Sequence, residues 1–217
     1  GGGFTVARLA DGRTLAMDYR EKAPGKAHRD MYLDASGNAQ LSKSQHGHLA
    51  AGVPGAVAGI FAAHKYAKLP FEKLIQPAIE LAEKGFVITE GEARGLNHSA
   101  EEFAQYNTFL PAFVKPGGWK AGDTLVQKDL ANTLKRIRDR GQAGFYEGET
   151  ARLIVEEMQR GGGNISAEDL EEVGDGTWAY LQLDGSWGLN NAGVLAGSEG
   201  VTLVDTCFTE RRTRDLL

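Results

Sequence analysis

Two stretches of the sequence decide the predicted fold: DYREKAP at residues 18–24 and GHLAAGVPGAVAG at residues 47–59. The first stretch places Arg20 at the end of a strand-like run. The second is a Gly/Pro turn that opens directly into a run of small residues, with Pro54 at a position that suits the first turn of a helix. An arginine at a strand end, followed by a turn into a helix, is a common way to assemble a carboxylate-binding pocket. We therefore expect a carboxylate site built around Arg20.

The rest of the chain up to about residue 171 predicts a mostly helical structure with one hairpin. The hairpin spans residues 4–20, with Asp11-Gly12 as a pair suited to positive φ in a tight turn. Residues 25–45 are polar and predict an excursion over the surface. Helices are predicted at residues 54–67, from Pro70 to a stop at Gly85, from a Thr89–Glu92 capping box to residue 105, at 128–140 and at 148–160, and a short turn is capped by Ser166 and Asp169.

The composition is that of a globular protein and limits the classes of partner. The 217 residues are 41% hydrophobic and carry a formal net charge of −5. Without a continuous basic stripe, this charge argues against a nucleic-acid partner. No run of eighteen apolar residues and no signal peptide is recognisable, so we expect no membrane span. The single cysteine, Cys207, can form no internal disulfide.

Further segments continue the pattern begun by the two opening stretches. They are LP at 69–70, QPAI at 76–79, AEKGF at 82–86, AGDTLVQ at 121–127, FYEG at 145–148 and ISAEDL at 165–170. Taken in order, all of these segments resemble the large subunit of a γ-glutamyltransferase (γ-glutamyltranspeptidase, glutathione hydrolase). We therefore interpret residues 1–171 as a large-subunit segment of that family.

This resemblance implies both a fold and an activity. The fold class is α/β (α+β), in which this segment is a mostly helical part of the layered αββα fold of the N-terminal-nucleophile hydrolases. The complete enzyme is expected to transfer or hydrolyse the γ-glutamyl group of glutathione, with an N-terminal threonine as nucleophile. The resemblance assigns Arg20 to the α-carboxylate of that substrate. It also implies a small-subunit partner chain, no cofactor, and a periplasmic or extracellular location.

The nucleophile of that family is not recognisable in these 217 residues. Gly1 has no hydroxyl group, and none of the threonines at positions 5, 14, 89, 108, 124 and 133 lies in a matching context. We therefore assign no catalytic residue and expect this segment to be inactive by itself. For Arg20 the alternative interpretation is an ordinary strand-end arginine paired with Asp18 or Glu21.

Residues 172–217 have a different composition, rich in residues that favour β-strands. Short strands are predicted at 177–183, 193–196 and 201–204, and this part resembles the N-terminal strands of a metallo-β-lactamase-fold hydrolase. The zinc signature of that family, His-x-His-x-Asp-His, is not matched, because His46 and His48 are followed by Ala50 and Ala51. We therefore expect no metal. Two alternatives stay open: a truncated zinc-hydrolase piece without its zinc motif, and a non-catalytic fusion or truncation product.

Overall fold

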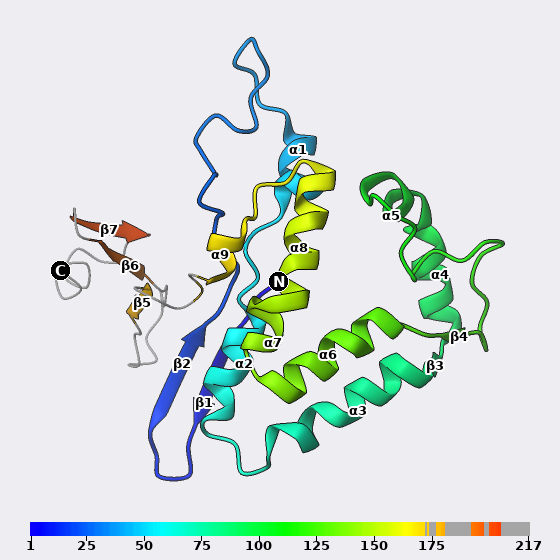
Figure 1. Ribbon diagram of the computed structural model, residues 1–217, viewed down its shortest axis with the longest axis horizontal. Helices are drawn as coiled ribbons and strands as arrows, with labels where there is room; N and C mark the ends of the chain where they lie inside the picture. Colours follow the sequence, from blue (N-terminus) through cyan, green and yellow to red (C-terminus); the bar gives the residue numbers. More distant parts are fainter. Residues whose placement is uncertain (172, 174–176, 181–191, 198–199, 205–217) are drawn as a thin grey trace. The chain divides into compact units, whose positions relative to one another are not determined.

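The computed structural model describes residues 1–171, 173, 177–180, 192–197 and 200–204 (Figure 1). The chain divides into two compact units. The first, here the hairpin unit, comprises Gly1–Glu21, Pro54–Ala63 and Glu172–Leu217. The second, here the helical unit, comprises Lys22–Val53 and His64–Glu171.

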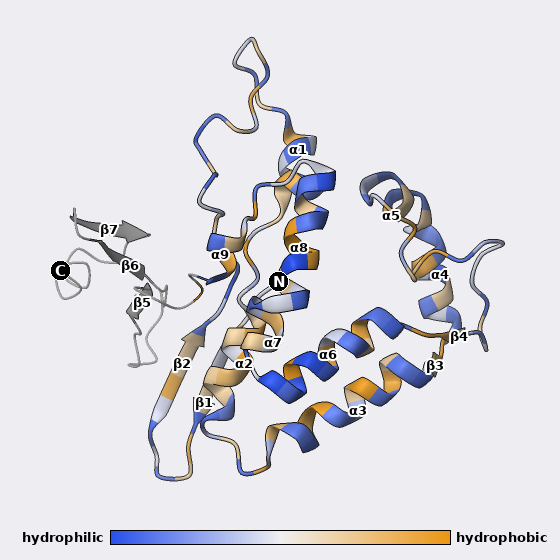
Figure 2. Ribbon diagram, in the orientation of Figure 1, coloured by the Kyte–Doolittle hydropathy of each residue, from blue (hydrophilic) through white to orange (hydrophobic). Residues whose placement is uncertain are grey.

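The hairpin unit contains the predicted hairpin and the glycine-rich helix. Strand β1 (Phe4–Arg8) pairs antiparallel with β2 (Thr14–Asp18), and Gly12 in the turn has φ of 87°, so the predicted Asp-Gly turn is confirmed. Helix α2 (Ala56–His64) is mostly apolar (Figure 2). It is shorter than the predicted range of 54–67 and ends at His64, whose carbonyl oxygen accepts the Ala67 amide in a turn at 2.9 Å.

Three short strands follow in the same unit. β5 (Thr177–Tyr180), β6 (Ala192–Gly197) and β7 (Gly200–Val204) form an antiparallel sheet in that order. The prediction of three strands in this part of the chain is confirmed. Residues 181–183, which the first predicted strand included, and Cys207 lie outside the described residues.

The helical unit contains a series of helices that pack against one another in turn. Helix α3 (Phe71–Lys84) packs against α6 (Lys128–Arg140), and α6 packs against α7 (Ala143–Tyr146), which packs against α8 (Gly148–Gly161) (Figure 1). Helices α3, α6 and α8 confirm the predicted ranges, whereas the short helix α7 was not predicted, and α3 stops at Gly85 as predicted, with φ of 83°. Leu130, although apolar, is 42% exposed. The buried positions of α6 are Ala131 and Ile137, because a small residue suits a close helix crossing.

A second part of the helical unit surrounds a small apolar core. The single helix predicted from Thr89 to residue 105 is two helices, α4 (Glu90–His98) and α5 (Ala100–Tyr106), with a break at Ser99. Two strands that the sequence did not predict, β3 (Phe86–Val87) and β4 (Thr124–Leu125), pair antiparallel. The core consists of Ile88, Ala93, Trp119 and Leu125, the last of which belongs to β4.

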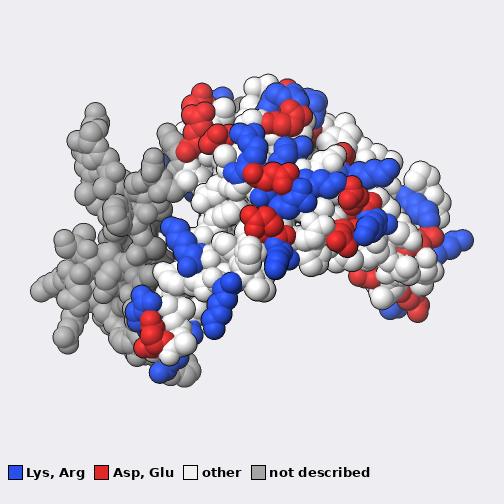
Figure 3. Space-filling view, turned by 60° about the horizontal axis from the view of Figure 1, so that its bottom comes forward, with Lys and Arg blue, Asp and Glu red and all other residues white. Residues whose placement is uncertain are grey.

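Short elements complete the helical unit. They are α1 (Leu41–Gln45), a 3-10 turn η1 (His48–Ala50) and α9 (Ala167–Glu171). Residues 34–38 form a turn, in which the Asp34 carboxylate accepts hydrogen bonds from the amides of Ser36 and Asn38. Basic and acidic side chains are interspersed on the face shown in Figure 3. Among the described residues, no helix is both long and apolar enough to cross a membrane.

Candidate carboxylate-binding site

Arg20 lies two residues beyond the end of β2, and its guanidinium is open to solvent. The Arg20 amide donates to the Asp18 carboxylate at 3.0 Å, so Asp18 bonds the backbone of Arg20. The guanidinium lies 3.7 Å from a Glu21 carboxylate oxygen, and the Arg20 side chain is 60% exposed. It also lies over the Phe4 ring, 5.8 Å from the ring centre. An exposed ion pair at this distance contributes little, so the guanidinium remains accessible to an incoming carboxylate.

Parts of the two stretches that open the sequence analysis, residues 18–21 and 54–59, lie together inside the hairpin unit. A Cβ atom added to Gly55 would lie 2.5 Å from the carbonyl oxygen of Tyr19 and 2.7 Å from that of Arg20. The amides of Gly55 and Ala56 donate to the carbonyl oxygen of Gly1, at 3.0 and 3.2 Å. These two amides at the start of α2 therefore already donate to a backbone carbonyl group of the chain. The Arg20 guanidinium, in contrast, is exposed and can bind a carboxylate.

The segments that adjoin the site in sequence are anchored within the helical unit. Lys22 and Val53 form an antiparallel bridge, with backbone N···O distances of 3.2 and 2.8 Å. The Gly25 amide donates to Asp169, which is 4% exposed, at 2.6 Å. Asp169 also accepts the Ser166 amide at 2.8 Å, which confirms the predicted cap. Sequence reasoning missed the link from Asp169 to Gly25, because no local signal joins positions so far apart.

The histidines that suggested a metal make other contacts. Nε2 of His48 donates to Glu157 at 2.7 Å, and the Thr108 hydroxyl donates to the same carboxylate. Burial raises the pKa of Glu157, but hydrogen bonds from Thr108, Arg160 and His48 outweigh it and lower that pKa to about 2. His46 stacks on Tyr106. Within the part of the chain that the structure describes, no group of three metal-binding side chains gathers.

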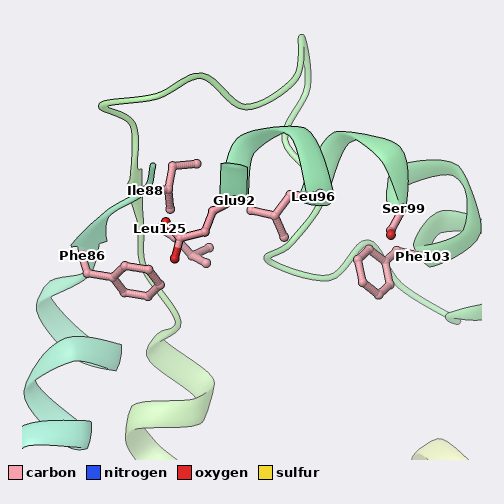
Figure 4. A pocket seen from close by; sticks show the side chains of 8 residues that line it. Phe86, Ile88, Glu92, Leu96, Ser99, Phe103 and Leu125 are labelled. Atoms are coloured by element: carbon pink, nitrogen blue, oxygen red, sulfur yellow. The ribbon is translucent and has the colours of Figure 1, made fainter. Parts of the chain in front are cut away.

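An apolar pocket of about 430 Å³ lies in the helical unit (Figure 4). Leu96 and Phe103 line it from α4 and α5, and Phe86 and Leu125 from β3 and β4. Its carboxylate, Glu92, is engaged by the amide and hydroxyl of the capping residue of α4. All of its lining residues belong to the helical unit, whereas Arg20 belongs to the hairpin unit.

Comparison with known proteins shows the family of the chain. The sequence model of the family described as Gamma-glutamyltranspeptidase matches residues 1–174. A glutathione hydrolase proenzyme of Escherichia coli is 44% identical over 173 residues, which cover 78% of this chain and 30% of that protein. A glutathione hydrolase proenzyme of Pseudomonas aeruginosa is 42% identical over 217 residues, 99% of this chain and 38% of that protein.

A crystal structure supports the same assignment. The gamma-glutamyltranspeptidase of Helicobacter pylori has a TM-score of 0.74 and 38% identity, and the match covers 95% of this chain and 56% of that chain. The predicted class, a mostly helical part of an N-terminal-nucleophile hydrolase, is confirmed by this likeness. The chain spans 30% and 38% of the two curated relatives above. The role of Arg20 and the boundary at residue 172 stay predictions. The chain belongs to the gamma-glutamyltranspeptidase family.

Proposed function

We propose that the full-length protein transfers or hydrolyses the γ-glutamyl group of glutathione and related amides, and that Arg20 binds the α-carboxylate of the glutamyl group. The observation that carries this proposal is the exposed guanidinium of Arg20 on a closely packed strand end. A planar guanidinium can hold a carboxylate with two parallel hydrogen bonds. The names of the relatives, glutathione hydrolase proenzymes, support the choice of substrate.

We further propose that the attacking threonine lies in a part of the protein outside these 217 residues. Several threonines of this segment have structural roles that do not suit a nucleophile. Thr89 caps α4, the Thr108 hydroxyl donates to Glu157, and Thr133 accepts from Arg136. The 217-residue segment by itself is then expected to have no turnover, and a small-subunit chain would complete the site.

The role of Arg20 is tested in the full-length protein with γ-glutamyl-p-nitroanilide as substrate. Arg20→Ala should raise KM about 100-fold, because charge-assisted hydrogen bonds contribute about 1.5–3 kcal/mol and each 1.4 kcal/mol is tenfold. Arg20→Lys should be intermediate, since it keeps the charge but not the planar pair of donors. Arg13→Ala is the matched control, because Arg13 is an exposed arginine of the same hairpin whose side chain pairs with Asp11. An unchanged KM in Arg20→Ala would refute the proposed role.

The missing nucleophile has its own test. The purified 217-residue segment is incubated with the same anilide, alone and after mixing with the remainder of the full-length protein. We expect no turnover from the segment alone. Turnover above buffer that disappears in Arg20→Ala would show that a nucleophile is present in the segment, contrary to this proposal.

The resemblance of residues 172–217 to a metallo-β-lactamase fold stays a prediction. The alignment with the P. aeruginosa relative extends over 99% of this chain, which favours one family for the whole chain over a joined zinc hydrolase. Metal analysis of the purified protein tests this preference, and a stoichiometric amount of zinc would count against it.

A further inference from the structure

Glycines enclose the backbone that carries Arg20. A Cβ atom on Gly2 would lie 2.3 Å from the Cα atom of Arg20, and one on Gly55 would lie 2.5 Å from the carbonyl oxygen of Tyr19. Real Cβ atoms essentially never approach other atoms below 3.0 Å. Neither glycine has positive φ, so the lack of a side chain here serves close packing. The backbone of Tyr19 and Arg20 therefore has little room to shift.

The ring of Tyr19 fills the space left by Gly59 of α2. A Cβ atom on Gly59 would lie 2.0 Å from Cγ of Tyr19 and 2.4 Å from its Cδ2 atom. At the far end of the ring, the Tyr19 hydroxyl lies 3.0 Å from Oγ1 of Thr5, within hydrogen-bonding distance. The base of the ring is thus seated on α2, and its hydroxyl is held by β1.

Gly55, the residue before α2, accepts the Gly59 amide at 3.0 Å, so these two glycines lie on the same face of the helix, one above the other. Through this face α2 contacts both the backbone and the ring of Tyr19. The guanidinium of Arg20, by contrast, is exposed. A long side chain such as that of arginine loses rotamer freedom when it is fixed on a ligand. A fixed backbone reduces the further freedom that binding must remove, which is preorganisation.

We propose that Gly59 and Tyr19 are positioning residues for the carboxylate-binding arginine. The Tyr19 ring, packed against Gly59, sets the direction in which the Arg20 side chain leaves the backbone. This inference rests on the proposed role of Arg20. It adds that the glycine face of α2 determines how well the enzyme recognises the α-carboxylate.

The test compares two substrates of the full-length protein that differ in one group. γ-Glutamyl-p-nitroanilide carries the α-carboxylate, and 4-aminobutyryl-p-nitroanilide lacks it but keeps the amine and the scissile amide. The readout is the ratio of their kcat/KM values. Gly59→Ala should lower this ratio about tenfold, because a methyl group there displaces the ring by an ångström or so, and misplacement of that order can cost up to 10²-fold. Gly95→Ala is the matched control, since Gly95 is a helical glycine with no atom within 4 Å of an added Cβ.

A second variant tests the physical link between the two residues. Tyr19→Val removes the ring and should lower the ratio as well. Adding Gly59→Ala to Tyr19→Val should lower it no further, because the ring that the methyl group would displace is gone. Circular dichroism checks that each variant is folded. If Gly59→Ala does not fold, Tyr19→Val decides the question alone.

The outcomes separate this inference from the proposed function. If Gly59→Ala or Tyr19→Val slows both anilides equally, the residue is merely structural and the inference is overturned. If Arg20→Ala lowers the ratio and the Gly59 and Tyr19 variants do not, the inference is overturned while the role of Arg20 stands. If Arg20→Ala leaves the ratio unchanged, the proposed role of Arg20 is refuted, and the inference that rests on it is refuted as well.

Discussion

Nε2 of His48 lies 2.7 Å from Oε1 of Glu157, a contact that joins η1 to α8 across 109 positions of the sequence. Both side chains are largely buried, with 11% and 19% of their surfaces exposed. Gly161 makes room for the imidazole, because an added Cβ there would lie 2.1 Å from the ring. The ionised carboxylate can only accept hydrogen bonds, so Nε2 is the donor.

This contact predicts a specific loss of stability in acid. The pKa of Glu157 is lowered from 4.5 to about 2, so its contribution is complete above the unfolded value and is lost as the pH falls toward 2. Between about pH 6 and pH 3 the wild-type chain should lose about 2 kcal/mol more stability than Glu157→Gln. Urea unfolding at the two pH values measures this difference. Equal losses in both proteins would contradict it.

The cap of α4 gives a second prediction. Thr89 accepts the Glu92 amide while the Glu92 carboxylate accepts the Thr89 amide, so Thr89→Ala should destabilise the chain by about 1 kcal/mol. Ser99→Ala is the matched control, because Ser99 stands at the N-cap of α5 without a side-chain cap hydrogen bond. Thermal unfolding of both variants decides the point. If they lower the melting temperature equally, the capping box is not what stabilises α4.

The end of α3 gives a third prediction. Gly85 has φ of 83°, and an added Cβ would lie 2.6 Å from Thr124 and 2.8 Å from the Leu125 carbonyl oxygen. Gly85→Ala should therefore cost about 2 kcal/mol or more, from backbone strain and overlap together. Gly95→Ala, at an open helical position, should instead stabilise by about 0.5–1 kcal/mol. Chemical denaturation should show that Gly85→Ala lowers the free energy of unfolding and Gly95→Ala raises it. A change in the same direction in both variants would contradict the strain argument.

The buried carboxylate of Asp169 gives a fourth prediction. Asp169→Ala leaves the amides of Gly25 and Ser166 without their acceptor, so it should cost about 2–3 kcal/mol. The Gly25 amide should also exchange its hydrogen faster, which NMR can follow directly. Asp34→Ala provides the comparison, because Asp34 bonds amides of an exposed turn. An unchanged exchange rate at Gly25 in Asp169→Ala would rule out the anchor.

Local signals predicted most of the helices and the hairpin. Gly12 turns the hairpin and Gly85 ends α3 at the positions that the sequence predicts, because both have positive φ, which strongly favours glycine. The capping pair Thr89 and Glu92 also acts within four residues. Contacts of this kind depend on neighbours in the sequence, so a single sequence is enough to find them.

Contacts between distant positions could not be predicted in this way. The pairing of β3 with β4 joins runs of two residues each, too short for any periodic signal. The seat of the Tyr19 ring on Gly59 depends on how α2 meets the hairpin. For the candidate site, the sequence placed Arg20 at a strand end and Gly55 at a helix start, but it did not show that the two backbones touch.

The bridge between Lys22 and Val53 has a practical consequence for protein engineering. It ties both ends of the excursion that contains the exposed turn at residues 34–38. When the ends of a loop are held by backbone hydrogen bonds, doubling its length costs only about 0.6 kcal/mol. Guest sequences such as an epitope tag or a fluorescent reporter should therefore be tolerated at that turn, while the residues on either side of the bridge keep their places.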